Sequence, residues 1–207
     1  MMTLVKLCGL RSIDDIQYAN DACPDMAGMI MAPGFRRSIT KELARSMVGE
    51  LFDVISSVGV FVDQDLDDVI ETARFVGFDM VQLHGSEDEE FITAVRSSLG
   101  IPVIKSFGIS EDQLSLARET SADMVLIDPG RGSGETFDLS LLNGIGRSII
   151  IAGGLTPDNV GETIRRVRPY GVDTSSGIES EGSKDREKMI RFVSAVRAED
   201  NQLEEER

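Results

Sequence analysis

Short apolar runs alternate with helical patterns along almost the whole chain, and this alternation constrains the fold more than any other feature. Several runs are nearly continuous in apolar residues, as expected of parallel strands buried on both faces of a sheet. Each is followed by a segment with apolar residues at helical spacing. The runs cover residues 3–8, 26–31, 57–62, 79–83, 102–107, 122–128 and 149–151, with a last run through Val172.

The alternation predicts an α/β fold with a parallel sheet, and a count of eight runs favours a single-domain (β/α)8 TIM barrel. The alternative is an open doubly wound sheet, which places a glycine-rich turn after its first strand. Here only Gly9 follows the first run, and the glycines gather late in the chain, so we prefer the barrel. We assign residues 1–198 to the barrel and 199–207 to an acidic C-terminal tail, a solvated helix end or a frayed terminus.

Several helix starts are marked by residues that cap helices. Ser12 and Thr40 precede helical patterns, and the sequences at 86–89 and 110–113 have the capping-box pattern of a serine followed three residues later by Glu or Gln. A further helix is expected to start at Thr156-Pro157, and the last one at 183–185.

Two late turns suit the binding of a phosphate group. One run ends in Gly153-Gly154, and the next ends in Ser175-Ser176-Gly177. Glycine lets backbone N–H groups approach a ligand closely, and the N-terminus of a helix attracts anions. Two consecutive turns of this kind near the end of a βα-repeating chain indicate the phosphate site of a barrel. The alternative is that the glycines only make tight turns.

Composition limits the classes of partner. The net charge of −15 argues against nucleic acid and against an anionic membrane surface, and a small anionic substrate would need a local positive pocket. Two cysteines and a single histidine, none with metal-ligand spacing, predict no metal site. We find no signal-peptide layout and no apolar segment of membrane-spanning length, so we expect a cytoplasmic protein with reduced thiols.

Two residues at strand ends are candidates for catalysis. Cys8 ends the first run, and its thiolate can act as a base or nucleophile if its pKa is brought down toward neutrality; the alternative is a small buried apolar residue. Asp128 ends the sixth run and can serve as an acid if the site has a low dielectric constant. The alternative for Asp128 is a cap on the turn that begins at Pro129.

Three further residues are candidates for substrate binding. Arg37, in the loop after the second run, can hold a carboxylate in a bidentate grip; the alternative is a solvated charge. His84 can line the pocket or donate one hydrogen bond, although a lone histidine at a strand end is more often structural. Asp173 can orient a substrate hydroxyl or neutralise a barrel lysine such as Lys6.

These residues lie within segments that resemble the phosphoribosylanthranilate isomerase family along nearly the full chain. The order and spacing of eight such segments is a specific signal, whereas a single GG or SSG would not be. The segments are VKLCG at 5–9, RSI at 37–39, VGVFVD at 58–63, VQLHGSED at 81–88, IPVIKSF at 101–107, LIDPGRGSGETFD at 126–138, IAGGLTPDNV at 151–160 and VDTSSGIESEGSKD at 172–185.

The resemblance implies an enzyme of tryptophan biosynthesis that carries out an Amadori rearrangement. The substrate would be N-(5-phosphoribosyl)anthranilate and the product 1-(2-carboxyphenylamino)-1-deoxyribulose 5-phosphate. Carried over by motif, Asp128 is the general acid, Cys8 the general base, and Arg37 the group that holds the anthranilate carboxylate. The backbones of the two late turns (Gly153-Gly154 and Ser175-Ser176-Gly177) hold the phosphate. The resemblance implies neither a metal nor an organic cofactor.

The chain departs from the family pattern after Asp128. The family has a longer loop there, leading to Gly-Gly-Thr-Gly and then Phe-Asp-Trp. Here the loop is shorter and reads RGSG at 131–134, with Arg131 at its start, and FDL at 137–139.

Two alternatives stay open. One is another phosphate-binding barrel isomerase, of the histidine-pathway type, which has an aspartate where this chain has Cys8. The other is a catalytically silent barrel that binds a phosphorylated ligand. The protein is expected to be a monomer or a homodimer.

Overall fold

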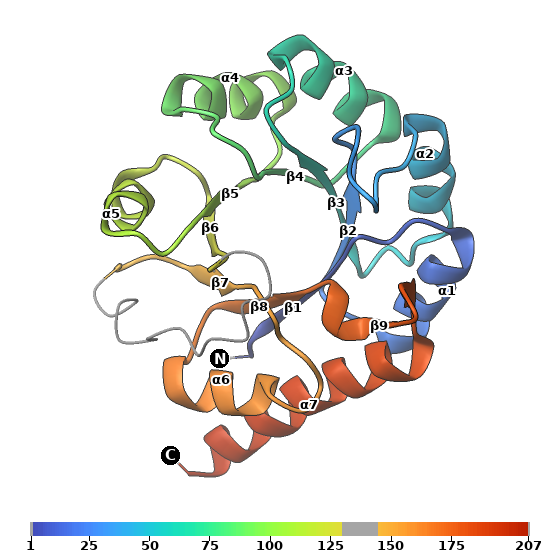
Figure 1. The fold of residues 1–207 in the computed structure, drawn as a ribbon, viewed down its shortest axis with the longest axis vertical. Helices are drawn as coiled ribbons and strands as arrows, with labels where there is room; N and C mark the ends of the chain where they lie inside the picture. Colours follow the sequence, from blue (N-terminus) through green and yellow to red (C-terminus); the bar gives the residue numbers. More distant parts are fainter. Residues whose placement is uncertain (1, 130–144, 207) are drawn as a thin grey trace.

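Parallel strands close into a barrel, in which neighbours in the ring are also consecutive along the chain (Figure 1). The computed structural model describes residues 2–129 and 145–206. The ring closes because β1 pairs in parallel with β8, with Lys6 opposite Asp173. This pairing confirms the (β/α)8 barrel and excludes an open sheet. The strands of the ring are β1 (Leu4–Cys8), β2 (Met26–Ile30), β3 (Ser56–Phe61), β4 (Met80–Leu83), β5 (Val103–Phe107), β6 (Met124–Ile127), β7 (Ile149–Ile151) and β8 (Gly171–Thr174).

The described helices form a layer outside the ring (Figure 1). Ser12, Thr40 and Ser110 cap helices as predicted, since each side chain accepts a hydrogen bond from the backbone N–H three residues later. A short hairpin of β9 (Glu179–Ser180) and β10 (Ser183–Lys184) follows the 3-10 helix η2 (Ser176–Ile178). The α-helices are α1 (Ile13–Ala22), α2 (Lys41–Glu50), α3 (Leu66–Val76), α4 (Glu89–Leu99), α5 (Glu111–Glu119), α6 (Val160–Val167) and α7 (Arg186–Glu205).

The buried apolar residues form two clusters, because successive side chains of a strand point to opposite faces. The larger cluster lies between the strands and the helices and includes Val5, Leu7 and Phe192. The smaller one consists mainly of alternate residues on the other face of the strands and fills the barrel: Met26, Val58, Ile104, Met124, Leu126, Ile150 and Ala152.

Two predicted helix starts are wrong. Helix α4 begins at Glu89, and its N-cap is Asp88, whose carboxylate accepts from the N–H of Phe91 at 2.9 Å. Ser86 instead donates to Asp63. Helix α6 begins at Val160 rather than at 156–157. The residues before it form a turn, which the side chain of Asn159 closes by accepting from the N–H of Thr156.

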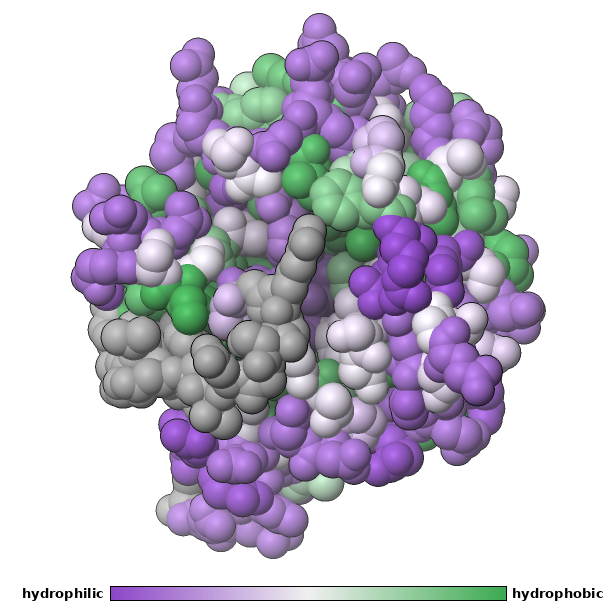
Figure 2. Space-filling model, viewed as in Figure 1, coloured by the Kyte–Doolittle hydropathy of each residue, from purple (hydrophilic) through white to green (hydrophobic). Residues whose placement is uncertain are grey.

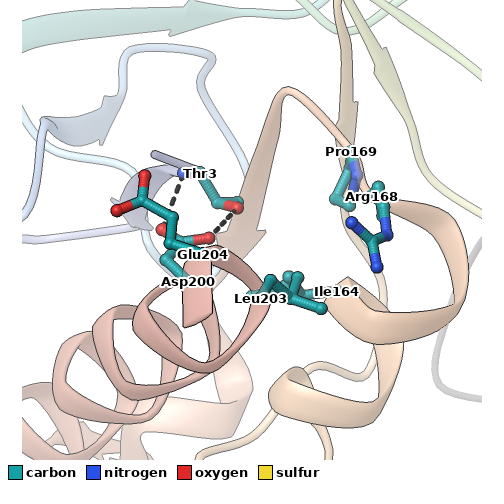
Figure 3. Close-up of a pocket in the computed structure, with 7 residues that line it drawn as sticks. All are labelled: Thr3, Ile164, Arg168, Pro169, Asp200, Leu203 and Glu204. Atoms are coloured by element: carbon teal, nitrogen blue, oxygen red, sulfur yellow. Dashed lines mark hydrogen bonds between the residues drawn. The ribbon is translucent and has the colours of Figure 1, made fainter. Parts of the chain in front are cut away.

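The C-terminal segment is the end of a helix, as one of the two predicted alternatives had it, but it is less solvated than predicted. Helix α7 continues to Glu205 and buries Glu199, Asp200 and Leu203. Asp200 accepts hydrogen bonds from the backbone N–H and the hydroxyl of Thr3, at 2.8 and 2.7 Å, just before β1 (Figure 3). The same end of the barrel has a cavity of about 180 Å³ lined by Thr3, Ile164, Arg168, Pro169, Asp200, Leu203 and Glu204 (Figure 3).

Hydrophilic side chains cover much of the face seen in Figure 2, as the net charge of −15 suggests. None of the helices in the described ranges is long and apolar enough to cross a membrane. Within residues 2–129 and 145–206, no three His, Cys, Asp or Glu side chains are grouped in a way that could hold a metal ion.

Candidate active site

The carboxyl ends of the strands meet at one mouth of the barrel, and most of the predicted site residues lie there. Cys8 is the last residue of β1. His84 and Asp128 each come directly after the last residue of their strands, β4 and β6. Asp173 lies within β8, next to β1 in the ring. Barrel closure thus brings together side chains that are more than a hundred residues apart.

Cys8 lies beside a buried ion pair. Lys6, which has no exposed surface, donates from Nζ to Asp173 Oδ1 at 2.8 Å. Gly28 on β2 makes room for both neighbours, since a Cβ there would lie 2.9 Å from Cys8 Sγ and 3.0 Å from Lys6 Nζ. Of the two roles proposed for Asp173, the neutralisation of Lys6 is therefore observed.

The electrostatic environment of the Cys8 thiol differs from what the sequence suggested. Burial raises its pKa, and the ammonium of Lys6 only partly opposes this effect. Few thiolates therefore form near neutral pH, but each of them is a stronger base than an ordinary cysteine thiolate. Cys8 is only 6% exposed, so a reacting atom must reach its thiol from the mouth of the barrel.

Asp128 and His84 lie close together at the mouth, on strands that are separated in the ring only by β5. His84 Nε2 lies 3.8 Å from Asp128 Oδ2, and each side chain keeps about a third of its surface exposed. Burial lowers the pKa of His84, and the carboxylate of Asp128 opposes this effect. His84 is therefore predominantly neutral near pH 7 and can act as a hydrogen-bond donor or acceptor.

The absence of a side chain at Gly153 makes room for the carboxylate of Asp128. The φ of Gly153, 87°, lies in the left-handed region that favours glycine. A Cβ at this position would also lie 2.7 Å from Cδ of Pro129 and 3.1 Å from Oδ1 of Asp128. The glycine is thus required both by the backbone conformation and by the close approach of the acid.

The two glycine turns lie against each other. A Cβ on Gly177 would lie 1.9 Å from the carbonyl oxygen of Leu155, and the hydroxyl of Thr174 donates to that same oxygen at 2.7 Å. Gly154, with φ 65°, faces open space. Outside its helices and strands, the described part of the chain shows no backbone carbonyl that accepts a hydrogen bond from the N–H of Gly153, Gly154 or Ser175. The turns therefore present amide donors side by side, as an anion site requires.

Arg37 does not project freely into the mouth but is held by Glu179. Its Nε and Nη2 donate to the two carboxylate oxygens at 2.6 and 3.0 Å. Gly9 makes room for the side chain of Arg37, since a Cβ at Gly9 would lie 2.5 Å from Arg37 Cδ. Only the Nη1 side of the guanidinium remains for another acceptor. The bidentate grip predicted from the sequence is thus made, but with a carboxylate of the protein.

Glu179 is shared by three cations. Arg36 Nη2 and Lys184 Nζ lie 2.6 and 3.2 Å from its oxygens, in addition to Arg37. Burial would raise the pKa of Glu179, but the hydrogen bonds from Arg37 and Arg36 and the charge of Lys184 outweigh it and lower the pKa to about 2. Lys184 also donates to the carbonyl of Ser175 at 2.7 Å, which places an ammonium at the phosphate turn.

Sequence reasoning missed Glu179 and Lys184. They face each other in the β9–β10 hairpin, whose two-residue loop, Glu181-Gly182, has positive φ at both positions. An X-Gly pair between two short extended segments is a recognisable hairpin signal. The segment GIESEGSKD thus contained the information that Glu179 and Lys184 lie on opposite strands of a hairpin.

A second ion pair braces the loop that follows His84. Lys105 Nζ donates to the carbonyl of Gly85 at 2.6 Å and to Glu87 Oε2 at 2.8 Å. Glu87 accepts in turn from the N–H groups of Gly85 and Asp63, both at 2.9 Å. Both charged side chains are at most 4% exposed. This network holds residues 85–87 as a turn rather than as the first turn of α4.

Comparison with known proteins agrees with this arrangement. The sequence model of the family described as N-(5'phosphoribosyl)anthranilate (PRA) isomerase matches residues 5–195. The chain belongs to the phosphoribosylanthranilate isomerase family. It is 39% identical to the N-(5'-phosphoribosyl)anthranilate isomerase of Acetivibrio thermocellus over 214 residues, which cover 96% of this chain and 98% of that protein.

Solved structures of this family have the same fold. The phosphoribosylanthranilate isomerase of Thermotoga maritima superimposes with a TM-score of 0.87 at 33% identity, covering 95% of this chain and 100% of that one. Another structure of the family contains reduced 1-(o-carboxyphenylamino)-1-deoxyribulose 5-phosphate and has a TM-score of 0.84, with 33% identity and the same coverage.

Family membership confirms the resemblance and the fold. The roles assigned to individual residues remain predictions. The shortened loop at 131–134, with Arg131, and the segment 137–139 lie outside the described residues.

Proposed function

We propose that this chain catalyses the Amadori rearrangement of N-(5'-phosphoribosyl)anthranilate in tryptophan biosynthesis, with Asp128 as general acid and Cys8 as general base. The observation that carries the proposal is the pairing of an acid and a thiol on separate strands of one barrel mouth, in a chain that belongs to the phosphoribosylanthranilate isomerase family. In the relative that contains the reduced product, the bound molecule has the carbon skeleton this reaction forms.

The chemistry needs one proton donor and one proton acceptor. Asp128 gives a proton to the ribose ring oxygen, which breaks the bond from that oxygen to C1 and leaves a protonated Schiff base. Cys8 then takes the proton from C2, and the electron pair of that bond forms the enolamine. Protonation at C1 and loss of the hydroxyl proton at C2 give the ketone. A buried thiolate with a raised pKa suits the second step, because a carbon acid needs a strong base.

The rest of the mouth supplies binding groups. The N–H groups of Gly153, Gly154 and the 175–177 turn hold the phosphate, with Lys184 adding positive charge. Arg37 meets the anthranilate carboxylate through its Nη1 side, since Glu179 occupies the other side. His84 contacts the substrate next to Asp128. The active unit is a monomer or a homodimer, which we place in the cytoplasm.

The test follows the loss of anthranilate fluorescence signal as substrate is converted. We expect Cys8→Ser and Asp128→Asn to lower kcat by about 10²–10⁴-fold with modest change in KM. The matched controls are Cys23→Ser, at an exposed cysteine, and Asp112→Asn, on the exposed face of α5. Both should keep wild-type kcat.

Three outcomes would count against the proposal. Full activity in Cys8→Ser or Asp128→Asn removes that residue from the mechanism. Turnover of a histidine-pathway substrate instead of the anthranilate compound assigns the other isomerase activity. Binding of the substrate by wild type with no turnover indicates a silent barrel.

A further inference from the structure

Gln82 is a buried polar residue that the mechanism above does not use. It lies on β4, two residues before His84, and is 1% exposed. Because side chains alternate along a strand, Gln82 and His84 point to the same side of β4. The amide Nε2 lies 2.8 Å from His84 Nδ1 and 3.1 Å from the hydroxyl oxygen of Ser106 on β5.

The two possible orientations of this amide are not equivalent. In the observed one, both N–H groups have an acceptor, and only Oε1 is buried without a partner among the described residues. Turning the amide over would place Oε1 between His84 and Ser106 and leave two N–H donors where Oε1 now lies. One unsatisfied acceptor costs less than two unsatisfied donors. The amide therefore donates to His84.

This hydrogen bond selects the tautomer of His84. A nitrogen that accepts a hydrogen bond carries no proton, so the proton of the neutral ring lies on Nε2. Nε2 is the atom that faces Asp128 Oδ2, at 3.8 Å. The other charged groups that act on the ring are Asp173, Lys6 and Lys105, and burial keeps the ring neutral near pH 7 by lowering its pKa.

We propose that Gln82 is a positioning residue, which holds His84 as the neutral Nε2–H tautomer so that an N–H donor faces Asp128. The catalytic consequence rests on the proposed function, whereas the tautomer does not. When Asp128 has given up its proton, this N–H stabilises the new carboxylate, directly or through the substrate oxygen between them. An imidazolium at the same place would favour the carboxylate from the start and leave less of the acid form that can give a proton.

The protein permits a direct test, because His84 is the only histidine in the chain. Long-range ¹H–¹⁵N NMR of the uniformly labelled protein reports the protonation of both ring nitrogens with no assignment problem. For wild type at pH 7 we expect Nε2 protonated and Nδ1 bare. The opposite tautomer in wild type would overturn the proposal, whether or not any variant folds.

Variants at Gln82 provide a second readout. In Gln82→Glu the carboxylate can only accept, so the tautomer should switch to Nδ1–H and the ring should remain charged to higher pH. Gln82→Met should populate both tautomers. Gln113→Glu is the matched control, because it adds the same charge on α5 with no contact to His84, and it should keep the wild-type spectrum. A Gln82→Glu spectrum identical to wild type would refute the role of Gln82.

The kinetic prediction separates positioning from simple structural support. Gln82→Glu and Gln82→Met should lower kcat by about tenfold or more, with KM within about twofold. In Gln82→Glu the acid limb of the pH profile of kcat should also move to higher pH. If kcat stays at the wild-type level in Gln82→Glu although the tautomer switches, Gln82 sets the tautomer without serving catalysis and the positioning role falls. A wild-type Nε2–H tautomer combined with a fully active Asp128→Asn would overturn the function assigned to Asp128 while leaving the tautomer assignment in place.

Discussion

Replacing Glu179 by glutamine keeps the shape of the side chain but removes the negative charge shared by Arg36, Arg37 and Lys184. The carboxylate accepts hydrogen bonds from all three at 2.6–3.2 Å, and its own side chain is 6% exposed. The variant leaves Lys184, with a fully buried side chain, near two arginines and without a counter-charge. We therefore expect a loss of stability larger than that of an ordinary surface ion pair.

The magnitude follows from the pKa of Glu179. A decrease from the usual 4.5 to about 2 corresponds to about 3 kcal/mol of stabilisation at neutral pH. Arg36 is 53% exposed, and solvent screening there reduces the expected value to about 2 kcal/mol. Because the folded-state pKa is the lower one, this stability is present above pH 4.5 and is lost as the pH falls toward 2. The difference between wild type and Glu179→Gln should therefore shrink to about half between pH 7 and pH 3.

Urea denaturation of both proteins at pH 7 and pH 3 measures these differences in the free energy of unfolding. The matched control is Glu111→Gln, at an exposed pair with Arg118 that is 3.8 Å apart, where we expect a change below about 0.5 kcal/mol. A Glu179→Gln cost as small as that of the control at pH 7 would refute the reasoning. So would a cost that is equal at pH 7 and pH 3.

Two further predictions concern the backbone. Gly177→Ala should destabilise the protein by about 3 kcal/mol or more and abolish phosphate binding, because the new Cβ would lie 1.9 Å from the carbonyl oxygen of Leu155. Gly154→Ala should cost only about 1 kcal/mol, because Gly154 faces open space and only its φ of 65° opposes the substitution. Thermal and urea denaturation measure both variants, and an equal loss of stability in Gly177→Ala and Gly154→Ala would contradict this prediction. Cys23→Gly should raise the free energy of unfolding by about 0.5–1 kcal/mol, because exposed Cys23 ends α1 in the left-handed conformation at φ 53°. A destabilised Cys23→Gly would show that its side chain contributes more than the strain costs.

The features that could be predicted from the sequence are those set by spacing along the chain. Apolar runs buried on both faces gave the strands, and their number gave the barrel, because a parallel sheet of eight strands closes readily. Cys8, His84 and Asp128 could be placed at the mouth because the carboxyl ends of parallel strands all lie at the same end of a barrel. The predicted caps at Ser12, Thr40 and Ser110 held for the same local reason.

Local signals failed where a distant partner competed for the same residue. The capping-box pattern at 86–89 predicted a helix start, but Ser86 is bound to Asp63 and Glu87 to Lys105, so α4 begins after them. The acidic end of α7 looked solvated, yet Asp200 anchors Thr3 at the opposite end of the chain. Composition suggests that charged residues are exposed to solvent, but they can be buried where the fold supplies a hydrogen-bond or ion-pair partner.

By itself, the sequence determined the fold, the family and the residues that lie at the ends of the strands. Only the tertiary structure decided which of those residues touch. Arg37 and Glu179 are 142 positions apart, and Lys6 and Asp173 are 167 apart, so these ion pairs exist because β1 closes the ring against β8. The same holds for the hydrogen bond from Gln82 to His84, which acquires its meaning from Asp128 on another strand. Spacing along the chain fixes which face a side chain occupies, whereas its partner and its charge state depend on what the closed barrel brings next to it.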